Sequence, residues 1–385
     1  MSERQKYFMV DRNRKYQRER GENVGITKYQ QVINWIEERI QNGTFKVGDR
    51  LDSEHDMSQY FGMSRQTVRH AIFVLQQKGV LESRQGSGNY IRAYDRIASR
   101  AKRQTKTIVI VSTYVNNYIF PRTIQGMESV LDKADYRIRI MFTHNQREEE
   151  KKILKRLLVE GNIDGLIIEP VKSALPNPNE TYYQQLQEQQ IPILFFNSFY
   201  ENCSIPYVSL NDIETGKKAT EYLIKQGHRK IGGIFKFEDG QGRRRYQGYL
   251  SALESNDIPL REKHIIWVDT EEQKNLQLSA EKILNRLRGC SACVCYNDEV
   301  AYELSKICRN ARIKIPEELS LISIDNSELA KLNIVPLTSI SHPMEKLGVK
   351  VAEHLLKMIE DSTFDISYEF EPELNVRNSV QVHTE

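Results

Sequence analysis

The chain has 385 residues, of which 39% are apolar and 28% charged. This length is typical of two or three domains with ordinary globular cores, so disorder throughout the chain is excluded. No apolar run approaches the roughly 18 to 20 residues of a membrane span, and the N-terminus lacks a secretory apolar stretch, so we expect a cytoplasmic protein.

The charge is distributed unevenly along the chain. Residues 1–106 contain 21 Lys and Arg against 12 Asp and Glu, although the whole chain carries only +3. A basic front part joined to an acidic body is expected when one domain faces a polyanion. A merely solvated basic surface would give the same count, so the charge alone does not decide between the two.

Four segments follow from composition and periodicity. Residues 1–25 are polar, with seven Lys or Arg, and we interpret them as a mobile basic extension. Residues 26–93 form the first compact domain, and residues 94–106 are basic and typical of a linker. Residues 107–385 form the body, which we expect to bind an effector and to dimerise.

Helical periodicity predicts three helices in residues 26–93. The first has apolar residues at helical spacing and ends at Gly43. Ser53 is expected to cap a second, short helix that Gly62 ends, and Ser64 to cap a third. The third helix carries polar residues on the face opposite its apolar side.

Two short helices joined by a Gly-containing turn are typical of a helix-turn-helix. Arg65, Gln66 and Arg69 lie in the first turns of the second of these helices, where Arg can bond guanine and Gln can bond adenine in the major groove. Residues 80–92 follow as two short apolar runs around a Gly-rich tip. This pattern predicts a hairpin, or wing, whose backbone approaches DNA closely.

The segment LDSEHDMSQYFGMSRQTVRHAIFVLQQKGVLESRQGSGNYI resembles the winged-helix domain of GntR-family transcription regulators, and the likeness covers residues 26–92. The resemblance implies double-stranded operator DNA as partner. Together with Gln66, the implied DNA contacts are Glu54, Arg65, Thr67, Arg69, Gln85, Gly86 and Gly88. The chain departs from the family at Asp52, where Pro is usual, and at Asn89, where Thr is common.

Three of these assignments have structural alternatives. Arg65 and Arg69 would look the same as solvated helix charges, and Glu54 is equally suited to capping its helix or orienting an arginine. We expect His70 to be a surface residue.

Residues 107–385 alternate short apolar runs with amphipathic stretches. The predicted strands are 108–111, 138–141, 166–168, 193–196, 231–234, 265–267, 293–295 and 321–324. This alternation favours parallel sheets covered by helices on both faces, and the length favours two α/β subdomains. The expected fold class is therefore an α+β winged helix-turn-helix domain followed by an α/β body of two parallel-sheet subdomains.

The two subdomains are expected to exchange segments. We assign about 107–208 with 342–368 to the first and about 209–341 with 369–385 to the second. The chain would then cross between them near residues 208–211, 340–344 and 370.

Nucleotide and metal signatures are missing from the body. It has neither a G-x-x-x-x-G-K-[ST] loop nor a G-x-G-x-x-G between strand and helix, which argues against kinases and dehydrogenases. The chain's five cysteines are too few for a disulfide framework, so we expect reduced thiols. The spacing of Cys290, Cys293 and Cys295 is compatible with zinc binding or redox chemistry. Their place in an apolar strand instead favours the core, with no metal and no cofactor.

Polar side chains follow most of the predicted strands. They are Tyr114 and Tyr118 after the first, Glu169 and Lys172 after the third, Asn197 after the fourth, Lys236, Asp239 and Arg245 after the fifth, Tyr296, Asn297 and Asp298 after the seventh, and Asp325 after the eighth. The carboxyl ends of parallel strands border the ligand cleft of such folds, so we expect these groups to converge on one crevice. Amide, charged and aromatic groups together suit a small polyhydroxylated ligand.

The body resembles the LacI/GalR family of sugar-sensing repressors and their periplasmic-binding-protein relatives over essentially all of residues 107–385. The segments TEYLIKQGHRKIGGI, CYNDEVA and ELSLISIDNS and the R-x-x-G at 245–248 carry this likeness. It implies sugar contacts from Asn197, Arg245, Asn297 and Asp325.

A closer resemblance is carried by STYVNNYIFPRTIQGMES, IDGLIIEPVKSAL, IFKFEDGQG and VCYNDE. These segments are similar to the arabinose-operon repressors, which join a GntR-type head to a LacI/GalR-type body. The resemblance implies L-arabinose or a similar monosaccharide as effector, and it places Tyr118, Lys172 and Lys236 in the pocket. It also implies a homodimeric repressor that the sugar releases from operator DNA.

Several alternatives stay open at this level. The structural alternatives are helix caps for Asn297 and Asp325, an interdomain ion pair for Arg245, and a cleft wall only for Tyr114. A different sugar or a nucleoside is a possible effector, because sugar epimers differ by one hydroxyl position. A sugar-binding enzyme would need a nucleophile or a base with a partner, and we find none. The basic winged-helix head argues against a sugar-transport protein.

Overall fold

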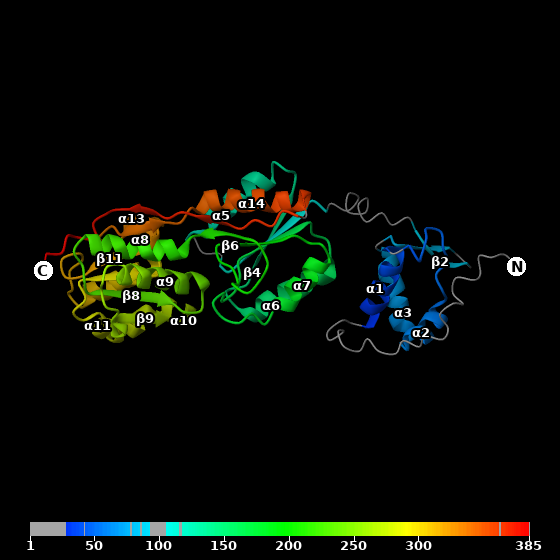
Figure 1. The fold of residues 1–385 in the computed structure, drawn as a ribbon, viewed down its shortest axis with the longest axis horizontal. Helices are drawn as coiled ribbons and strands as arrows, with labels where there is room; N and C mark the ends of the chain where they lie inside the picture. Colours follow the sequence, from blue (N-terminus) through cyan, green and yellow to red (C-terminus); the bar gives the residue numbers. More distant parts are fainter. Residues whose placement is uncertain are drawn as a thin grey trace. The chain divides into compact units, whose positions relative to one another are not determined.

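The computed structural model describes residues 28–41, 43–77, 79–84, 87–92, 105–114, 118–361 and 363–384. The chain divides into two compact units, Met1–Gln104 and Thr105–Glu385 (Figure 1). No helix within the described ranges is both long and apolar enough to cross a membrane.

The first unit contains three helices and a hairpin. They are α1 (Lys28–Gln41), α2 (Glu54–Phe61), α3 (Arg65–Gln77), β1 (Leu81–Arg84) and β2 (Gly88–Ile91). The two strands are antiparallel, with Leu81 opposite Ile91. The apolar sides of the helices and Ile91 form one core. The helices and the wing that periodicity predicts are thus confirmed.

The second unit has two lobes, each built on a six-stranded sheet. The first lobe has the strand order β13-β7-β6-β5-β3-β4, with every pair parallel. Its strands are β3 (Thr107–Ser112), β4 (Arg137–Phe142), β5 (Gly165–Ile168), β6 (Ile193–Phe196), β7 (Tyr207–Leu210) and β13 (Tyr368–Phe370). The side chains of β3, β5 and β6 are buried on both faces, as expected for a covered parallel sheet.

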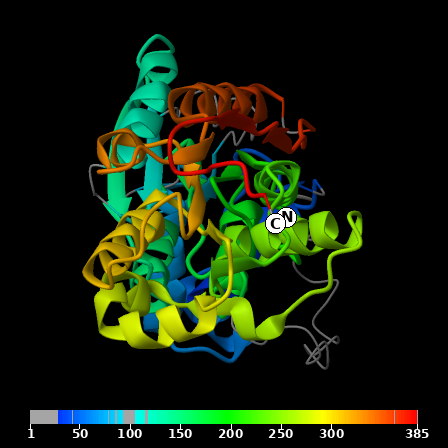
Figure 2. The ribbon, with the colours of Figure 1, turned by 90° about the vertical axis from the view of Figure 1, so that its left-hand side faces the viewer.

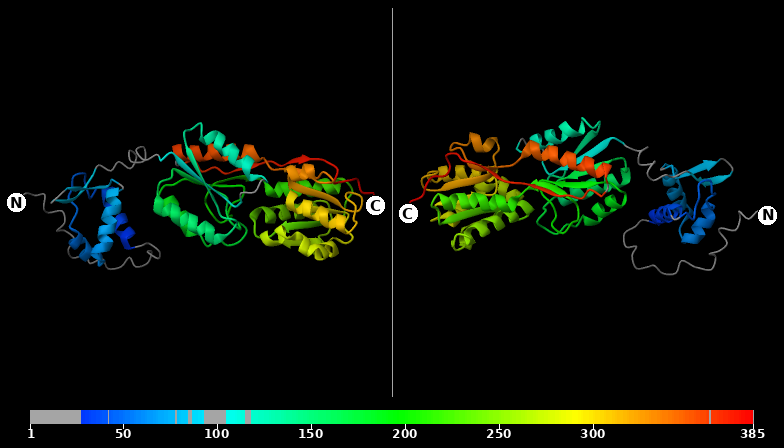
Figure 3. Two further views of the ribbon diagram at one scale, coloured as in Figure 1. Left: turned by 180° about the vertical axis from the view of Figure 1, so that it is seen from behind. Right: turned by 45° about the horizontal axis from the view of Figure 1, so that its top comes forward.

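Two pairs of helices cover the two faces of this sheet. α5 (Phe120–Leu131) and α14 (Met344–Glu360) lie side by side on one face (Figure 3). α6 (Arg147–Glu160) and α7 (Glu180–Glu188) cover the other face.

The second lobe has the strand order β14-β12-β11-β10-β8-β9. Its strands are β8 (Ile231–Lys236), β9 (Ile265–Val268), β10 (Ala292–Cys295), β11 (Ser320–Asp325), β12 (Thr338–Ser341) and β14 (Glu373–Asn375). The helices α8 (Asp212–Lys225) and α9 (Gly240–Glu254) cover one face. The other face is covered by α11 (Ala280–Leu287), α12 (Asp298–Asn310), α13 (Glu328–Leu332) and the 3-10 turn η3 (Leu276–Ser279) (Figure 2). Two short elements, η2 (Glu262–His264) and α10 (Thr270–Lys274), flank β9. Cys293 and Cys295 are free and fully buried in β10, which confirms their place in the core.

The chain passes between the lobes after β7, after β12 and after β13. Beyond the eight predicted runs, the body contains β7, β12 and β13, which lie at the predicted crossovers, and β14, which was not predicted. The prediction of fully parallel sheets also fails in one place. β14 pairs antiparallel to β12, since it arrives directly from the other lobe with no crossover helix to reverse the chain.

Two glycines allow α8 and α9 to pack closely. A Cβ on Gly216 would collide with the carbonyl oxygen of Arg245, and a Cβ on Gly248 would collide with that of Ile213. This contact fixes the first turns of α9 against α8, and it places the Arg245 side chain beside Asp212 at the start of α8.

Candidate functional site

The turn between α2 and α3 is shaped by caps at both sides. The Ser53 side chain accepts a hydrogen bond from the Asp56 backbone N–H at 3.2 Å, and Gly62 ends α2 in the left-handed region with a φ of 63°. Ser64 accepts from the Thr67 backbone N–H at 3.2 Å. The predicted caps are confirmed, and α3 begins directly after a tight turn, as a recognition helix does.

α3 presents its polar side chains to solvent. Arg65, Gln66 and Arg69 are exposed, Thr67 is half-buried at the edge of this face, and Val68 is fully buried on the opposite side. The face is therefore free to enter a groove of DNA while the core stays intact.

Two side chains of α2 hold the two arginines of α3. The Arg69 guanidinium donates from Nε and Nη2 to the Glu54 carboxylate at 2.8 to 3.1 Å. The Arg65 Nη2 donates to Nδ1 of His55 at 2.6 Å. Of the roles left open for Glu54, orienting an arginine is the one realised here. His55 was missed, because nothing in the local sequence pattern connects it with a residue ten positions later.

The wing is a short antiparallel hairpin. Gly88 has a φ of 107°, a backbone conformation that favours glycine, and a Cβ there would lie 3.3 Å from Arg50 Nε. The Ser87 and Tyr90 hydroxyls are 2.5 Å apart across the hairpin. The predicted contacts Gln85 and Gly86 lie outside the described residues.

In the body, Tyr118 reaches from the first lobe to the second. Its hydroxyl donates to Asp325 Oδ2 at 2.6 Å and accepts from the Asp298 backbone N–H at 3.2 Å. Burial raises the pKa of Tyr118 well above its usual value, so the hydroxyl keeps its proton.

Arg245 is fully buried beside two carboxylates. Its Nε donates to Asp212 Oδ1 at 2.8 Å, its Nη1 donates to the Tyr296 carbonyl at 2.7 Å, and its Nη2 lies 3.7 Å from Asp325 Oδ1. Both carboxylates belong to the second lobe, so the interdomain ion pair considered for Arg245 is not formed. A guanidinium stays charged when buried, and the two carboxylates offset that charge.

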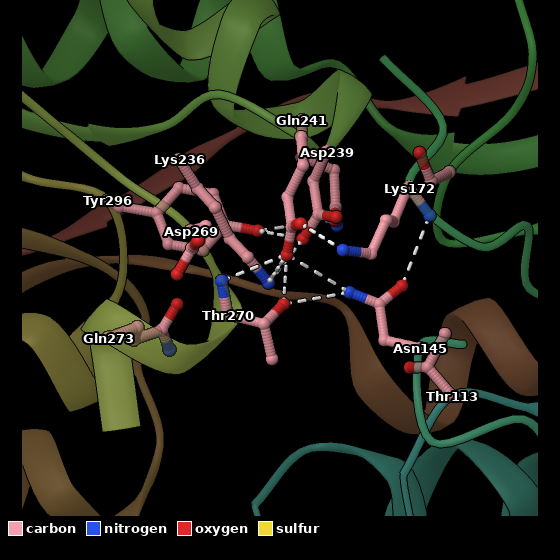
Figure 4. Close-up of polar contacts among 12 residues, drawn as sticks. Thr113, Asn145, Lys172, Lys236, Asp239, Gln241, Asp269, Thr270, Gln273 and Tyr296 are labelled. Atoms are coloured by element: carbon pink, nitrogen blue, oxygen red, sulfur yellow. Dashed lines mark hydrogen bonds and ion pairs between the residues drawn. The ribbon is translucent and has the colours of Figure 1, made fainter. Parts of the chain in front are cut away.

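A second polar cluster joins the lobes just after the end of β8 (Figure 4). The Lys172 ammonium of the first lobe lies 2.7 Å from Glu238 Oε2 of the second. Asn145 Nδ2 donates to Thr270 Oγ1 at 2.9 Å and lies 3.4 Å from Glu238 Oε1, while Asn145 Oδ1 accepts from the Lys172 backbone N–H. Glu238 therefore receives donors from both lobes.

Lys236 and Asp239 lie next to this cluster, at the end of β8 (Figure 4). Lys236 is the last residue of the strand, is buried, and places its ammonium 2.8 Å from Asp239 Oδ2. The Tyr296 hydroxyl lies 3.3 Å from Asp239 Oδ2. Although burial alone would lower it, the Asp239 carboxylate raises the pKa of Lys236, which stays protonated.

Glu169 and Asn197 form the first-lobe side of the cleft base. Glu169 accepts from the Thr113 backbone N–H at 2.9 Å and from Asn197 Nδ2 at 2.6 Å. Asn197 Oδ1 accepts from Gln241 at 3.3 Å and from His342 Nε2 at 2.8 Å. Burial lowers the pKa of His342 to about 3, so its ring is neutral and Nε2 carries the proton.

The capping alternatives for Asn297 and Asp325 have different outcomes. Asn297 Oδ1 accepts from the Val300 backbone N–H at 3.0 Å, so Asn297 caps α12. Asp325 is the last residue of β11 and caps no helix, since α13 begins after Ser327. Asp325 therefore lies at the junction of the lobes. Asn297 has only its amide nitrogen left to bond a ligand, because its side-chain oxygen caps α12.

Tyr114 contacts the second lobe from the end of β3. Its ring lies 5.9 Å from the Lys274 ammonium, and its buried hydroxyl lacks a hydrogen-bond partner among the described residues. The structure thus gathers all twelve predicted side chains around the junction of the lobes.

Sequence reasoning missed several residues of this site: Asn145, Asp212, Glu238, Gln241, Thr270, Gln273 and His342. Asp298, which was expected at the crevice, is deeply engaged. It accepts from the Ser323, Ser327 and Ser339 hydroxyls at 2.5 to 2.8 Å, and burial raises its pKa to about 7.

Among the described residues, no group of three or more His, Cys, Asp and Glu side chains is arranged to hold a metal. The carboxylates of the cleft are instead paired with Arg, Lys, Tyr and Asn donors. Such a site can bind a neutral ligand with several hydroxyl groups by exchanging these hydrogen bonds.

Two family models match the chain. Residues 28–91 match bacterial regulatory proteins of the gntR family, and residues 220–380 match the periplasmic binding protein-like domain. Among solved structures, the transcription regulator CcpA of Lactococcus lactis is similar with a TM-score of 0.64 and 22% identity, covering 71% of this chain and 99% of that one. This likeness shows the fold of the body.

Two curated relatives are similar over almost the whole chain. The arabinose metabolism transcriptional repressor of Halalkalibacterium halodurans is 36% identical over 364 residues, which cover 92% of this chain and 96% of the relative. The repressor of the same name from Geobacillus stearothermophilus is 37% identical over 359 residues, covering 91% and 96%. Identity at this level across both units means that the chain belongs to the family of arabinose metabolism transcriptional repressors.

Proposed function

We propose that this protein binds operator DNA through α3 and the β1–β2 hairpin and leaves it when L-arabinose binds between the two lobes of the body. The observation that carries the proposal is the meeting of polar side chains from both lobes at the carboxyl ends of the strands. The relatives' name supports L-arabinose as the sugar, and the polar side chains at the junction of the lobes support this place for it.

The effector is proposed to contact residues of both lobes. Arg245 and Asp325 offer a buried donor and a buried acceptor to neighbouring hydroxyls, as sugars require. Asn197 offers the same pair of groups from the first lobe. The rings of Tyr118 and Tyr296 would pack on the C–H faces of the sugar. Glu169, Lys172, Lys236, Asp239, Asn297 and Tyr114 complete the proposed effector-binding set.

The coupling between sugar and DNA is proposed to act through lobe closure. The hydrogen bonds of Tyr118, Asn145 and Lys172 across the cleft are made only when the lobes are together. A sugar that favours this state and weakens operator binding must itself bind more weakly to the DNA-bound protein, because linkage is reciprocal. A coupling of about 1 to 3 kcal/mol would change operator affinity 5- to 150-fold.

We further propose a homodimer, because a two-fold operator is read by two heads. A groove of about 490 Å³ runs between α12 and the segment after α13. Leu332 and Ile334 at its edge are 78% and 73% exposed, which is unusual for apolar side chains of this size. A second copy of the chain is the proposed occupant. Leu332→Glu with Ile334→Glu should then halve the mass measured by light scattering, and an unchanged mass would exclude this face.

We propose that the protein is a regulator and not an enzyme, and that it acts in the cytoplasm, where its operator lies. The protein binds its effector and releases it chemically unchanged. Incubation of the pure protein with L-arabinose should therefore leave the sugar intact by chromatography, and any turnover would revive the enzyme hypothesis.

The decisive experiment is operator binding measured by fluorescence anisotropy at fixed salt with a panel of sugars and one nucleoside. L-arabinose alone should release the DNA. Release by another member of the panel would keep the regulator and replace the effector. Release by none of them would contradict sugar control of this protein.

A further inference from the structure

Three buried polar atoms of the cleft have no hydrogen-bond partner among the described residues. They are the Tyr114 hydroxyl, Gln273 Oε1 and His342 Nδ1. A buried polar atom without a partner costs about 1 to 3 kcal/mol, so native proteins rarely leave one without a reason. Three of the ten such atoms among the described residues lie at the junction of the lobes, where a polar ligand would supply partners for them.

Gln273 lies on α10, and its orientation is fixed. Its Nε2 donates to Glu299 Oε2 at 3.0 Å, and a carboxylate oxygen is an acceptor. The opposite end of the amide, Oε1, is therefore left as a pure acceptor. In Figure 4, Gln273 lies on the same side of the cluster as Thr270 and Tyr296, apart from the hydrogen bonds that join Asn145 and Lys172 to the second lobe.

Tyr114 approaches α10 from the other lobe. Its ring lies 5.9 Å from the ammonium of Lys274, the residue after Gln273. Its hydroxyl can donate or accept. A ligand between Tyr114 and Gln273 would thus meet one pure acceptor from the second lobe and one hydroxyl from the first.

We propose that Gln273 and Tyr114 bind the effector directly and from opposite lobes, with Gln273 Oε1 accepting a hydrogen bond from one sugar hydroxyl. This proposal rests on the proposed function and adds a residue that selects among sugars. A hydroxyl is demanded at this position, because a hydrogen or a fluorine there cannot donate and leaves Oε1 buried and unpaired.

The chain offers a matched control for Gln273. Gln277, four residues further on, also donates its Nε2 to a glutamate of α12, Glu303, at 2.8 Å. Its Oε1 is not among the buried atoms that lack a partner. Gln273→Met and Gln277→Met therefore each remove an amide donor to a glutamate of α12, and Gln277→Met also removes a bond to the Glu303 carbonyl at 3.0 Å. Only Gln273→Met removes the unpaired acceptor.

The test is isothermal titration of the full chain with L-arabinose and with its monodeoxy and monofluoro analogues. Gln273→Met should weaken L-arabinose binding about 10- to 100-fold, whereas Gln277→Met should bind as the wild type does. One analogue should bind poorly to the wild type and lose that disadvantage in Gln273→Met. Tyr114→Phe, which removes only the hydroxyl, should weaken binding as well and serves where Gln273→Met fails to fold.

The outcomes separate this proposal from the proposed function. Wild-type binding of L-arabinose with equal affinity in Gln273→Met and Tyr114→Phe would overturn the direct contacts and leave the effector site in place. Equal losses in Gln273→Met and Gln277→Met would also overturn them, since a general effect on α10 and η3 would then explain both. If the wild type binds no sugar at all, the effector assignment fails and this proposal fails with it.

Discussion

The Lys172 ammonium and the Glu238 carboxylate form an ion pair 2.7 Å long that joins the two lobes of the body. Glu238 is almost fully buried, while the Lys172 side chain is 33% exposed. Lys172 also has a φ of 47°, a conformation that residues other than glycine seldom adopt. The pair is available only when the lobes are closed, so it favours the state that we propose for the sugar complex.

Lys172→Met should weaken L-arabinose binding about fivefold, because the closed state loses one interlobe ion pair worth about 1 kcal/mol. Isothermal titration measures this loss. Lys151→Met is the matched control, since Lys151 is similarly exposed at 35% and pairs with Glu148 within α6 only. Its affinity should be unchanged.

A double-mutant cycle separates the ion pair from direct sugar contact. If Lys172 acts through Glu238, Lys172→Met should have little further effect in a Glu238→Gln background. If it costs the same factor in both backgrounds, Lys172 contacts the sugar and the ion pair has no part in closure.

Glu54→Ala should lower operator affinity, even though it removes a negative charge from the DNA-binding face. The carboxylate holds Nε and Nη2 of Arg69 and leaves the end of the guanidinium free to meet a base or a phosphate. We expect a loss of about 1 kcal/mol or more, approaching that of Arg69→Ala, in anisotropy titrations at fixed salt. Tighter binding by Glu54→Ala would mean that Glu54 only repels phosphates.

Much of the fold follows from local pattern. The caps at Ser53 and Ser64, the apolar face of α3 and the buried runs of β3, β5 and β10 are properties of neighbouring residues, and each was predicted from the sequence. The short strands β7, β12 and β13 lie at the predicted crossovers near residues 208–211, 340–344 and 370. β14 has only three residues, and its pairing with β12 depends on the chain's return from the other lobe, so it could not be predicted as a strand.

The residues of the site also divide into those that the local sequence predicts and those that it does not. Arg245 and Asp325 were predicted because they follow or end strands, and strand ends share one edge of a sheet. Gln273 is the fifth residue after β9, and only its hydrogen bond to Glu299, 26 positions later, marks it as part of the site. Asn297 is the opposite case, a predicted ligand contact that has a local structural role. Its side-chain oxygen caps α12.

Arg245→Met should destabilise the body by about 3 to 5 kcal/mol, because it leaves Asp212 and Asp325 buried without their cation. Urea unfolding at pH 7 measures the change. Arg243→Met, two residues earlier on α9, removes an exposed guanidinium that donates only to the Ala174 carbonyl, and it should cost less than about 1 kcal/mol. Equal losses for the two variants would exclude a special role for the buried cation.

The pH dependence of stability should contain a contribution from His342. Burial lowers its pKa to about 3, so between about pH 6.5 and pH 3 the unfolded chain binds one proton that the folded chain does not. The free energy of unfolding therefore falls by about 1.4 kcal/mol per pH unit as the pH drops through this window. Asp298, with a pKa raised to about 7, acts in the opposite direction, so the wild-type curve alone does not isolate His342.

His342→Gln keeps a donor for Asn197 and removes the titration. Urea unfolding of both proteins at pH 7.5 and pH 5.0 should show that the wild type loses about 2 kcal/mol more than the variant on acidification. An equal loss in both proteins would mean that His342 takes up its proton in the folded state as easily as in the unfolded chain.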